Sequence, residues 1–154
     1  MGGKIAIVTV HGTGDSAEEP DGAPGGDRWF QTRSQFIDRL KQRLAGRGIE
    51  ADVIPLLWSG ANSAIARDKG AGKLAALLRR LGKTYEGRIH VIGHSHGGNV
   101  ANDAAVRLNW SRAQKRPKLA SLTTVGTPFF RSRVSGGDRL GAWIFAFVML
   151  ASII

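Results

Sequence analysis

The chain has 154 residues, enough for one domain with a core of its own and too few to expect two. Its hydrophobic fraction of 42% argues against disorder, and the absence of cysteine excludes disulfides and thiolate metal sites. The 22 Lys and Arg residues against 12 Asp and Glu residues give a formal net charge of +10. No long basic run and no RNA-binding or zinc-finger pattern accompanies this charge, so we expect no nucleic-acid partner.

Short β-branched runs alternate with helical patterns along most of the chain. The first run, at 4–10, is short and apolar, which is typical of a fully buried strand in a parallel sheet. Pro55 in the second run indicates an edge strand, because proline cannot donate to a central ladder. The alternation predicts an α/β fold with a doubly wound, mostly parallel sheet of about four strands. Expected strands cover 4–10, 51–58, 88–92 and 119–125, and expected helices cover 28–45, 63–81 and 99–112.

The turn GHSHG at 93–97 carries the clearest functional signal. Hydrolysing an ester needs a hydroxyl that is held in the open, away from its own helix. A Gly-x-Ser-x-Gly turn between a strand and a helix does this, because the serine takes a strained backbone conformation and the small residues two positions away avoid its crowding. The following helix can aim N–H groups at the developing charge. The pattern predicts Ser95 as a nucleophile; a glycine-rich turn without chemistry is the alternative.

Three segments together resemble a known superfamily. They are IAIVTVHGTG at 5–14, HVIGHSHGGNVA at 90–101 and VGTP at 125–128. In this order they resemble the α/β-hydrolases, and within them the lipase and esterase branch. The resemblance covers roughly 4–129. It implies a serine hydrolase that acts on a carboxylic ester or lipid and needs no cofactor.

The resemblance also implies an oxyanion hole. Its two donors would be the backbone N–H groups of His96, next to the nucleophile, and of Thr13, in the His-Gly loop. Each such donor is typically worth about 2.7 to 4 kcal/mol of barrier. We expect His11 to brace that loop through side-chain hydrogen bonds, with a partly exposed loop histidine as the alternative. His94 and His96 flank the serine but point away from its hydroxyl, so we expect them to line the site or pack beside it.

The general base is the part of the family's triad that the sequence lacks. The family orders its triad as nucleophile, acid and histidine, and no histidine follows His96. Asp138 is the better-placed candidate for the acid, ahead of Asp103 on the helix after the turn, although a surface charge is the plainer interpretation. Three explanations stay open: the front part of a longer enzyme, which we favour; a non-catalytic relative that binds; or a base supplied by His11 or His90.

The segment 140–154 contains no charged residue. Its 15 positions fall short of the roughly 20 that a membrane-spanning helix needs. Arginines just before it predict a cytoplasmic hydrolase part, at the face of a membrane if the segment inserts there. We therefore expect a core at 1–139 and an apolar segment at 140–154 that associates with a membrane or forms a buried helix. Histidines and carboxylates show no metal-ligand spacing, so we expect no metal.

Overall fold

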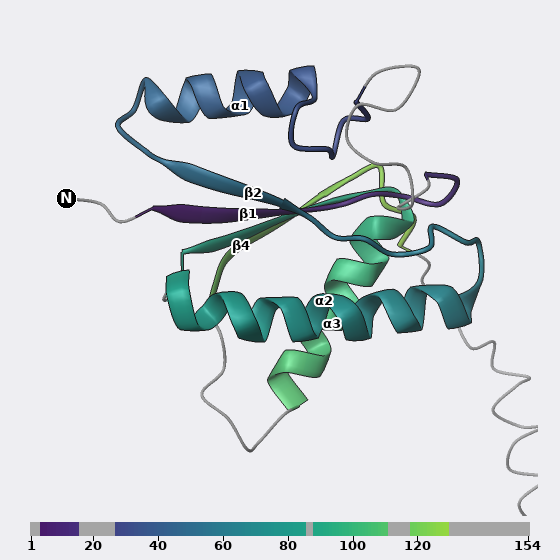
Figure 1. Ribbon diagram of the computed structural model, residues 1–154. Helices are drawn as coiled ribbons and strands as arrows, with labels where there is room; N and C mark the ends of the chain where they lie inside the picture. The colour runs from purple at the N-terminus through teal and green to yellow at the C-terminus, as the bar shows by residue number, and fades with distance from the viewer. Residues whose placement is uncertain (1–3, 16–26, 86–87, 111–117, 130–154) are drawn as a thin grey trace, which may run out of the picture.

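The computed structural model describes residues 4–15, 27–85, 88–110 and 118–129, and these form a parallel sheet with helices on both faces (Figure 1). The four strands lie in the order β2-β1-β3-β4, and each neighbouring pair is parallel. The predicted α/β fold with a parallel sheet is therefore confirmed. In chain order the elements are β1 (Ile5–Val10), α1 (Gln35–Ala45), β2 (Ala51–Pro55), α2 (Ala64–Tyr85), β3 (Ile89–His94), α3 (His96–Trp110) and β4 (Leu119–Val125).

Strand β1 lies in the middle of the sheet and is buried on both faces. Its residues Val8 and Val10 point into the core that α2 and α3 cover, and both are fully buried. Thr9 points to the opposite face, where its hydroxyl donates to the Phe30 carbonyl at 2.8 Å. Burying a valine side chain stabilises a fold by about 1.5 to 3 kcal/mol. The apolar run predicted as a buried strand thus forms a central, buried strand of the sheet.

The main core lies between the sheet and the pair of helices α2 and α3, which Figure 1 shows on one face, with α1 on the other. Leu74 and Leu78 of α2 and Val100 of α3 are buried there. Trp58, which follows β2, inserts its ring beside α2, where Gly70 leaves room for it. A side chain at Gly70 would start 3.1 Å from the Trp58 ring. The small residue therefore sets how closely α2 approaches the sheet.

Helix α1 begins at Gln35, and the expected start at residue 28 is wrong. Ser34 is the cap: it has an extended backbone, and its hydroxyl accepts from the Ile37 N–H at 3.2 Å. A serine cap of this kind satisfies an N–H that the first turn of a helix leaves free. Only Ile37 of the helix is buried, and Phe36 is 42% exposed. The residues before the helix form turns, and Phe30 within them is buried next to Thr9 of β1.

Four other predicted boundaries are also wrong. Helix α2 continues through Gly82 to Tyr85, although a glycine inside a helix costs about 1 kcal/mol relative to alanine. The Tyr85 hydroxyl, which donates to Asp52 at 2.6 Å, holds the end of this helix against β2. Strand β2 ends at Pro55, in the edge position that the proline predicted. Strand β3 runs to His94, and α3 begins directly after Ser95.

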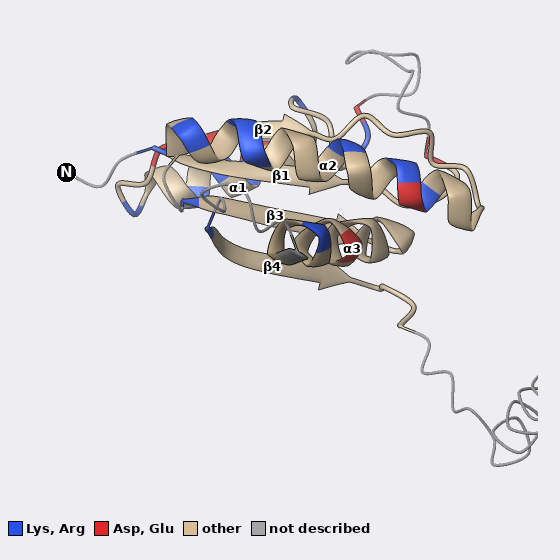
Figure 2. Ribbon diagram, turned by 90° about the horizontal axis from the view of Figure 1, so that it is seen from below, with Lys and Arg blue, Asp and Glu red and all other residues tan. Residues whose placement is uncertain are grey.

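Basic residues gather along α2, where six Lys or Arg side chains stand against one aspartate (Figure 2). Among the residues that the structure describes, no helix is long and apolar enough to cross a membrane. The segment 140–154 lies outside those residues, so its expected membrane association and the division into 1–139 and 140–154 stay predictions.

Candidate functional site

Ser95 stands alone in the turn between β3 and α3, with a backbone φ of 51°. It is the one non-glycine residue with a positive φ in the described part of the chain. Its N–H donates to the Val125 carbonyl at 2.9 Å, and its own carbonyl accepts from Gly98 at 3.0 Å. These two bonds hold a conformation that costs an L-residue roughly 1 to 2 kcal/mol. Ser95 is partly exposed.

Glycines on both sides of Ser95 allow the turn to close. A methyl group on Gly97 would collide with the carbonyl oxygens of Val10 and His11 at the end of β1. A methyl group on Gly93 would lie 2.8 Å from the Gly98 nitrogen. The start of α3 therefore touches the end of the central strand. This contact brings two segments that are far apart in the sequence to one point at the carboxyl end of the sheet.

The His-Gly loop after β1 lies directly against the turn. A methyl group on Gly12 would lie 2.9 Å from the Ser95 Cβ atom. The loop is held from behind, because the Trp58 indole N–H donates to the His11 carbonyl at 3.0 Å. Gly14 adds a bond from its N–H to the Gly60 carbonyl at 3.0 Å. The loop is thus held by bonds to Trp58 and Gly60, and it lies against Ser95.

The backbone N–H groups of Thr13 and His96 flank this contact. Within the described residues neither group donates a hydrogen bond. His96 is the first residue of α3, where the N–H groups of an initial turn have no partner inside the helix. Both residues are partly exposed. Thr13 follows the glycine that lies against Ser95, and His96 follows Ser95 itself, so both donors belong to the segments that meet at the serine, where the resemblance predicts an oxyanion hole.

His11 is fully buried and braces the loop. Its Nδ1–H donates to the Gly12 carbonyl at 2.9 Å, and its ring lies 4.7 Å from that of Phe30 and 5.4 Å from that of Trp58. Its Nε2 atom is buried without a partner among the described residues. Burial lowers the pKa of His11, because a charged ring would lose its water. The predicted bracing role is confirmed, and a partly exposed histidine is not what the structure contains.

The other three histidines make contacts of their own, and no hydrogen bond joins Ser95 to a histidine in the part of the chain that the structure describes. His96 donates from Nδ1 to Asn99 at 3.0 Å. His90 pairs with the Ser121 hydroxyl at 2.8 Å. His94 is exposed and packs edge-on against the Trp29 ring at 5.9 Å. These contacts agree with the expectation that both flanking histidines pack or line the site.

The Gly-Thr-Pro segment after β4 reaches the same point. A methyl group on Gly98 would collide with the Thr127 side chain, so this threonine covers the first turn of α3. The Pro128 carbonyl accepts from the Asn99 side chain at 3.3 Å. Asn99 therefore bridges His96 and the loop after β4. Sequence reasoning missed it, because only the fold brings 127–129 next to 96–99.

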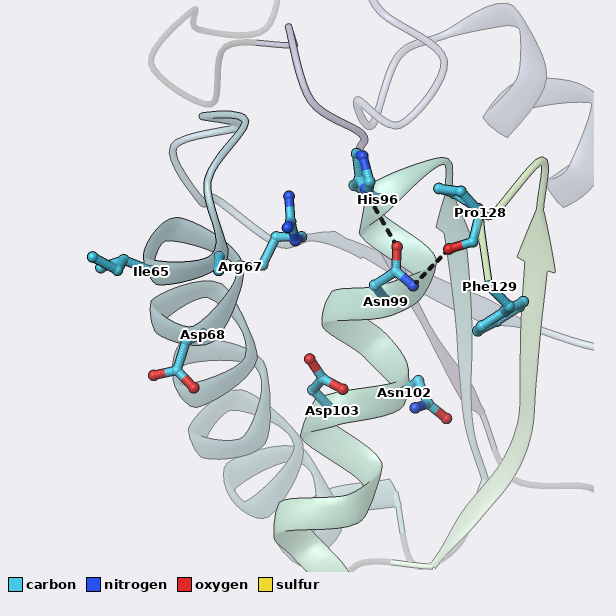
Figure 3. A pocket seen from close by; sticks show the side chains of 10 residues that line it. Ile65, Arg67, Asp68, His96, Asn99, Asn102, Asp103, Pro128 and Phe129 are labelled. Carbon is cyan, nitrogen blue, oxygen red and sulfur yellow. Dashed lines mark hydrogen bonds between the residues drawn. The ribbon is translucent and has the colours of Figure 1, made fainter. Parts of the chain in front are cut away.

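A cleft of about 710 Å³ opens beside the turn, between the start of α2, α3 and the segment after β4 (Figure 3). Arg67 stands on its α2 side, and His96, Asn99 and Asp103 stand on its α3 side. Asp103 is exposed and lies two helical turns along α3 from the serine, which separates it from the candidate nucleophile. Asp138, the other predicted acid, lies outside the described residues.

The described residues contain no group of three or more His, Cys, Asp or Glu side chains that would hold a metal ion. Comparison with models of known protein families, with curated proteins and with solved structures gave no match. The geometry around Ser95 is therefore the basis for inferring a function.

Proposed function

We propose that the protein is a serine hydrolase that cleaves carboxylic esters and that Ser95 is its nucleophile. The observation that carries this proposal is the φ of 51° at Ser95, in a turn that joins a buried strand to a helix. Strain of this kind gathers where a catalytic side chain must be presented. A Gly-x-Ser-x-Gly pattern indicates a nucleophile only where it joins a strand to a helix, as it does here.

The chemistry follows from the groups around the serine. The Ser95 oxygen attacks the carbonyl carbon of the ester, and the carbonyl oxygen becomes an oxyanion. The N–H groups of Thr13 and His96 donate to that oxyanion, helped by the positive end of α3. The C–O bond to the alcohol then breaks, the alcohol takes up a proton, and Ser95 keeps the acyl group until water removes it. The proton that Ser95 gives up passes to a base and from that base to the departing alcohol; the histidine hydrogen bonds of the described residues do not assign this base.

A binding protein built on the same turn is the second candidate. The observation in its favour is that no histidine bonds to Ser95 among the described residues. Such a protein would bind an ester or a lipid in the same place and release it unchanged. Labelling of the serine separates the two candidates, because a reactive hydroxyl is needed only for turnover.

The experiment is labelling with a fluorophosphonate probe, followed by mass spectrometry of the modified peptide. We expect one phosphonate on Ser95 and complete loss of labelling in Ser95→Ala. Ser121→Ala is the matched control, because Ser121 is an exposed serine on β4 with no positive φ, and its loss should leave labelling intact. A folded protein that the probe does not label would contradict the enzyme and favour the binding protein.

A further inference from the structure

The cleft beside Ser95 is lined by both apolar and polar side chains. Ile65 and Phe129 stand at the rim and are 70% and 60% exposed. The wall is formed by the side chains of His96, Asn99 and Asn102 on α3. A ligand that fits this cleft therefore carries both an apolar part and a polar group.

Arg67 is the positively charged side chain among the described residues that line this cleft. It lies near the start of α2, and its guanidinium makes one long hydrogen bond, 3.4 Å to the exposed Asn62. No carboxylate lies within 4.0 Å of it among the described residues. Figure 3 shows its side chain between α2 and the start of α3. A partly buried arginine whose guanidinium has most of its donors unused among the described residues is suited to a carboxylate or phosphate.

The two acidic residues of the cleft do not neutralise Arg67. Asp68 is already paired with Arg107 across the two helices. Asp103 is exposed and forms no ion pair within the described residues. The start of α3, which carries the positive end of its dipole, lies at the Ser95 end of the cleft. Arg67 and the start of α3 both place positive charge at that end of the cleft, which suits an anion.

We propose that the cleft binds an acidic group, a carboxylate or a phosphate, carried by the ester that Ser95 cleaves, and that Arg67 pairs with it. This inference rests on the proposed function and adds the class of substrate: esters that carry a negative charge beside the scissile bond. The apolar rim would contact the hydrocarbon part of the same molecule. Asp103 limits the site to one anionic group, because a second would face its carboxylate.

The test compares esters that differ by one charge. Mono-4-nitrophenyl glutarate and 4-nitrophenyl pentanoate have acyl parts of the same length and differ in a carboxylate. Butyryl glycerol phosphate and monobutyrin differ in a phosphate on the alcohol. We expect a lower KM for the charged member of at least one pair, and the responding pair identifies the acid. Arg67→Gln should raise the ratio of charged to neutral KM roughly 10- to 100-fold.

Two further variants test the sign of the charge effect and its location. Asp103→Asn removes a negative charge from the same cleft and should lower that KM ratio. Arg80→Gln makes the same substitution on an exposed part of α2 outside the cleft and should leave it unchanged. A KM ratio that Arg67→Gln does not move, with neutral esters still hydrolysed, would overturn the acidic substrate and leave the hydrolase standing. Failure to hydrolyse any of the four esters, together with no labelling of Ser95, would overturn both.

Discussion

At the scale of single residues, the site depends on one strained serine and on the glycines that surround it. Ser95 takes the left-handed conformation, and Gly12, Gly93 and Gly97 leave room for the three segments that meet there. Each of these glycines faces backbone or side-chain atoms closer than a Cβ atom normally approaches. The absence of side chains at these positions is therefore what brings the His-Gly loop against Ser95.

Gly97→Ala tests this crowding. The new methyl group would collide with two carbonyl oxygens at the end of β1, and backbone cannot move aside as a flexible side chain can. Overpacking of this kind typically costs about 1 to 3 kcal/mol, so we expect a fall of that size in the free energy of unfolding. Gly46→Ala is the control: its nearest neighbours lie 3.6 Å and 3.8 Å away and its φ is −61°. Equal urea midpoints for the two variants would contradict the crowding.

The sequence predicted the residues of the turn but not all of their neighbours. Ser95 follows from a local pattern, because strand, turn and helix signals are contained in a few adjacent residues, and the resemblance to the α/β-hydrolases added Thr13 and His96. Arg67 and Asn99 carried no such signal. Their roles depend on how α2 crosses α3 and on where the chain goes after β4, and neither can be read from spacing. The predicted acid Asp138 remains a prediction.

At the scale of elements, the predicted order of strands and helices is confirmed and several boundaries are wrong. The order was predictable because buried strands and amphipathic helices have different hydrophobic periods. The boundaries depend on tertiary contacts. Gly82 reads as a helix stop, yet α2 passes through it to place Tyr85 against Asp52. Ser34 starts α1 later than the apolar pattern suggests, because its hydroxyl caps the helix.

Helix α2 offers a test of packing against intrinsic propensity. Gly72 faces only the end of the Arg107 side chain at 3.5 Å, so alanine fits there and should stabilise the protein by about 0.5 to 1 kcal/mol. Gly70 lies on the buried face against Trp58 at 3.1 Å, so alanine should bring no gain there and a small loss. Thermal unfolding of the two variants measures the difference. An increase in thermal stability in both variants would mean that Trp58 does not limit how closely α2 approaches the sheet.

At the scale of the whole molecule, His11 links the stability of the fold to pH. Burial lowers its pKa below the ordinary value of 6.5, so the unfolded chain takes up the proton first as the pH falls. The contribution of His11 to stability is complete above pH 6.5 and is lost as the pH falls below that value. The buried ring contacts both Phe30 and Trp58, so its protonation places a charge against these two aromatic rings.

Urea unfolding at pH 7.5 and pH 5 tests this link. We expect the free energy of unfolding to be lower at pH 5. His11→Asn keeps a donor near the Gly12 carbonyl and removes the titrating ring, so its stability should change less between the two pH values. His94→Gln is the control, because it removes an exposed histidine and leaves the buried His11 in place. A pH dependence that His11→Asn does not reduce would assign the effect to other groups.

The central position of β1 has a consequence for synthesis. One edge of this strand pairs with β2, but the other waits for β3, which leaves the ribosome about 80 residues later. At roughly 5 to 20 residues per second, that wait lasts about 4 to 16 seconds. An apolar strand with an unpaired edge is a template for association with other chains. The strand order thus gives a nascent-chain chaperone a defined interval in which to bind.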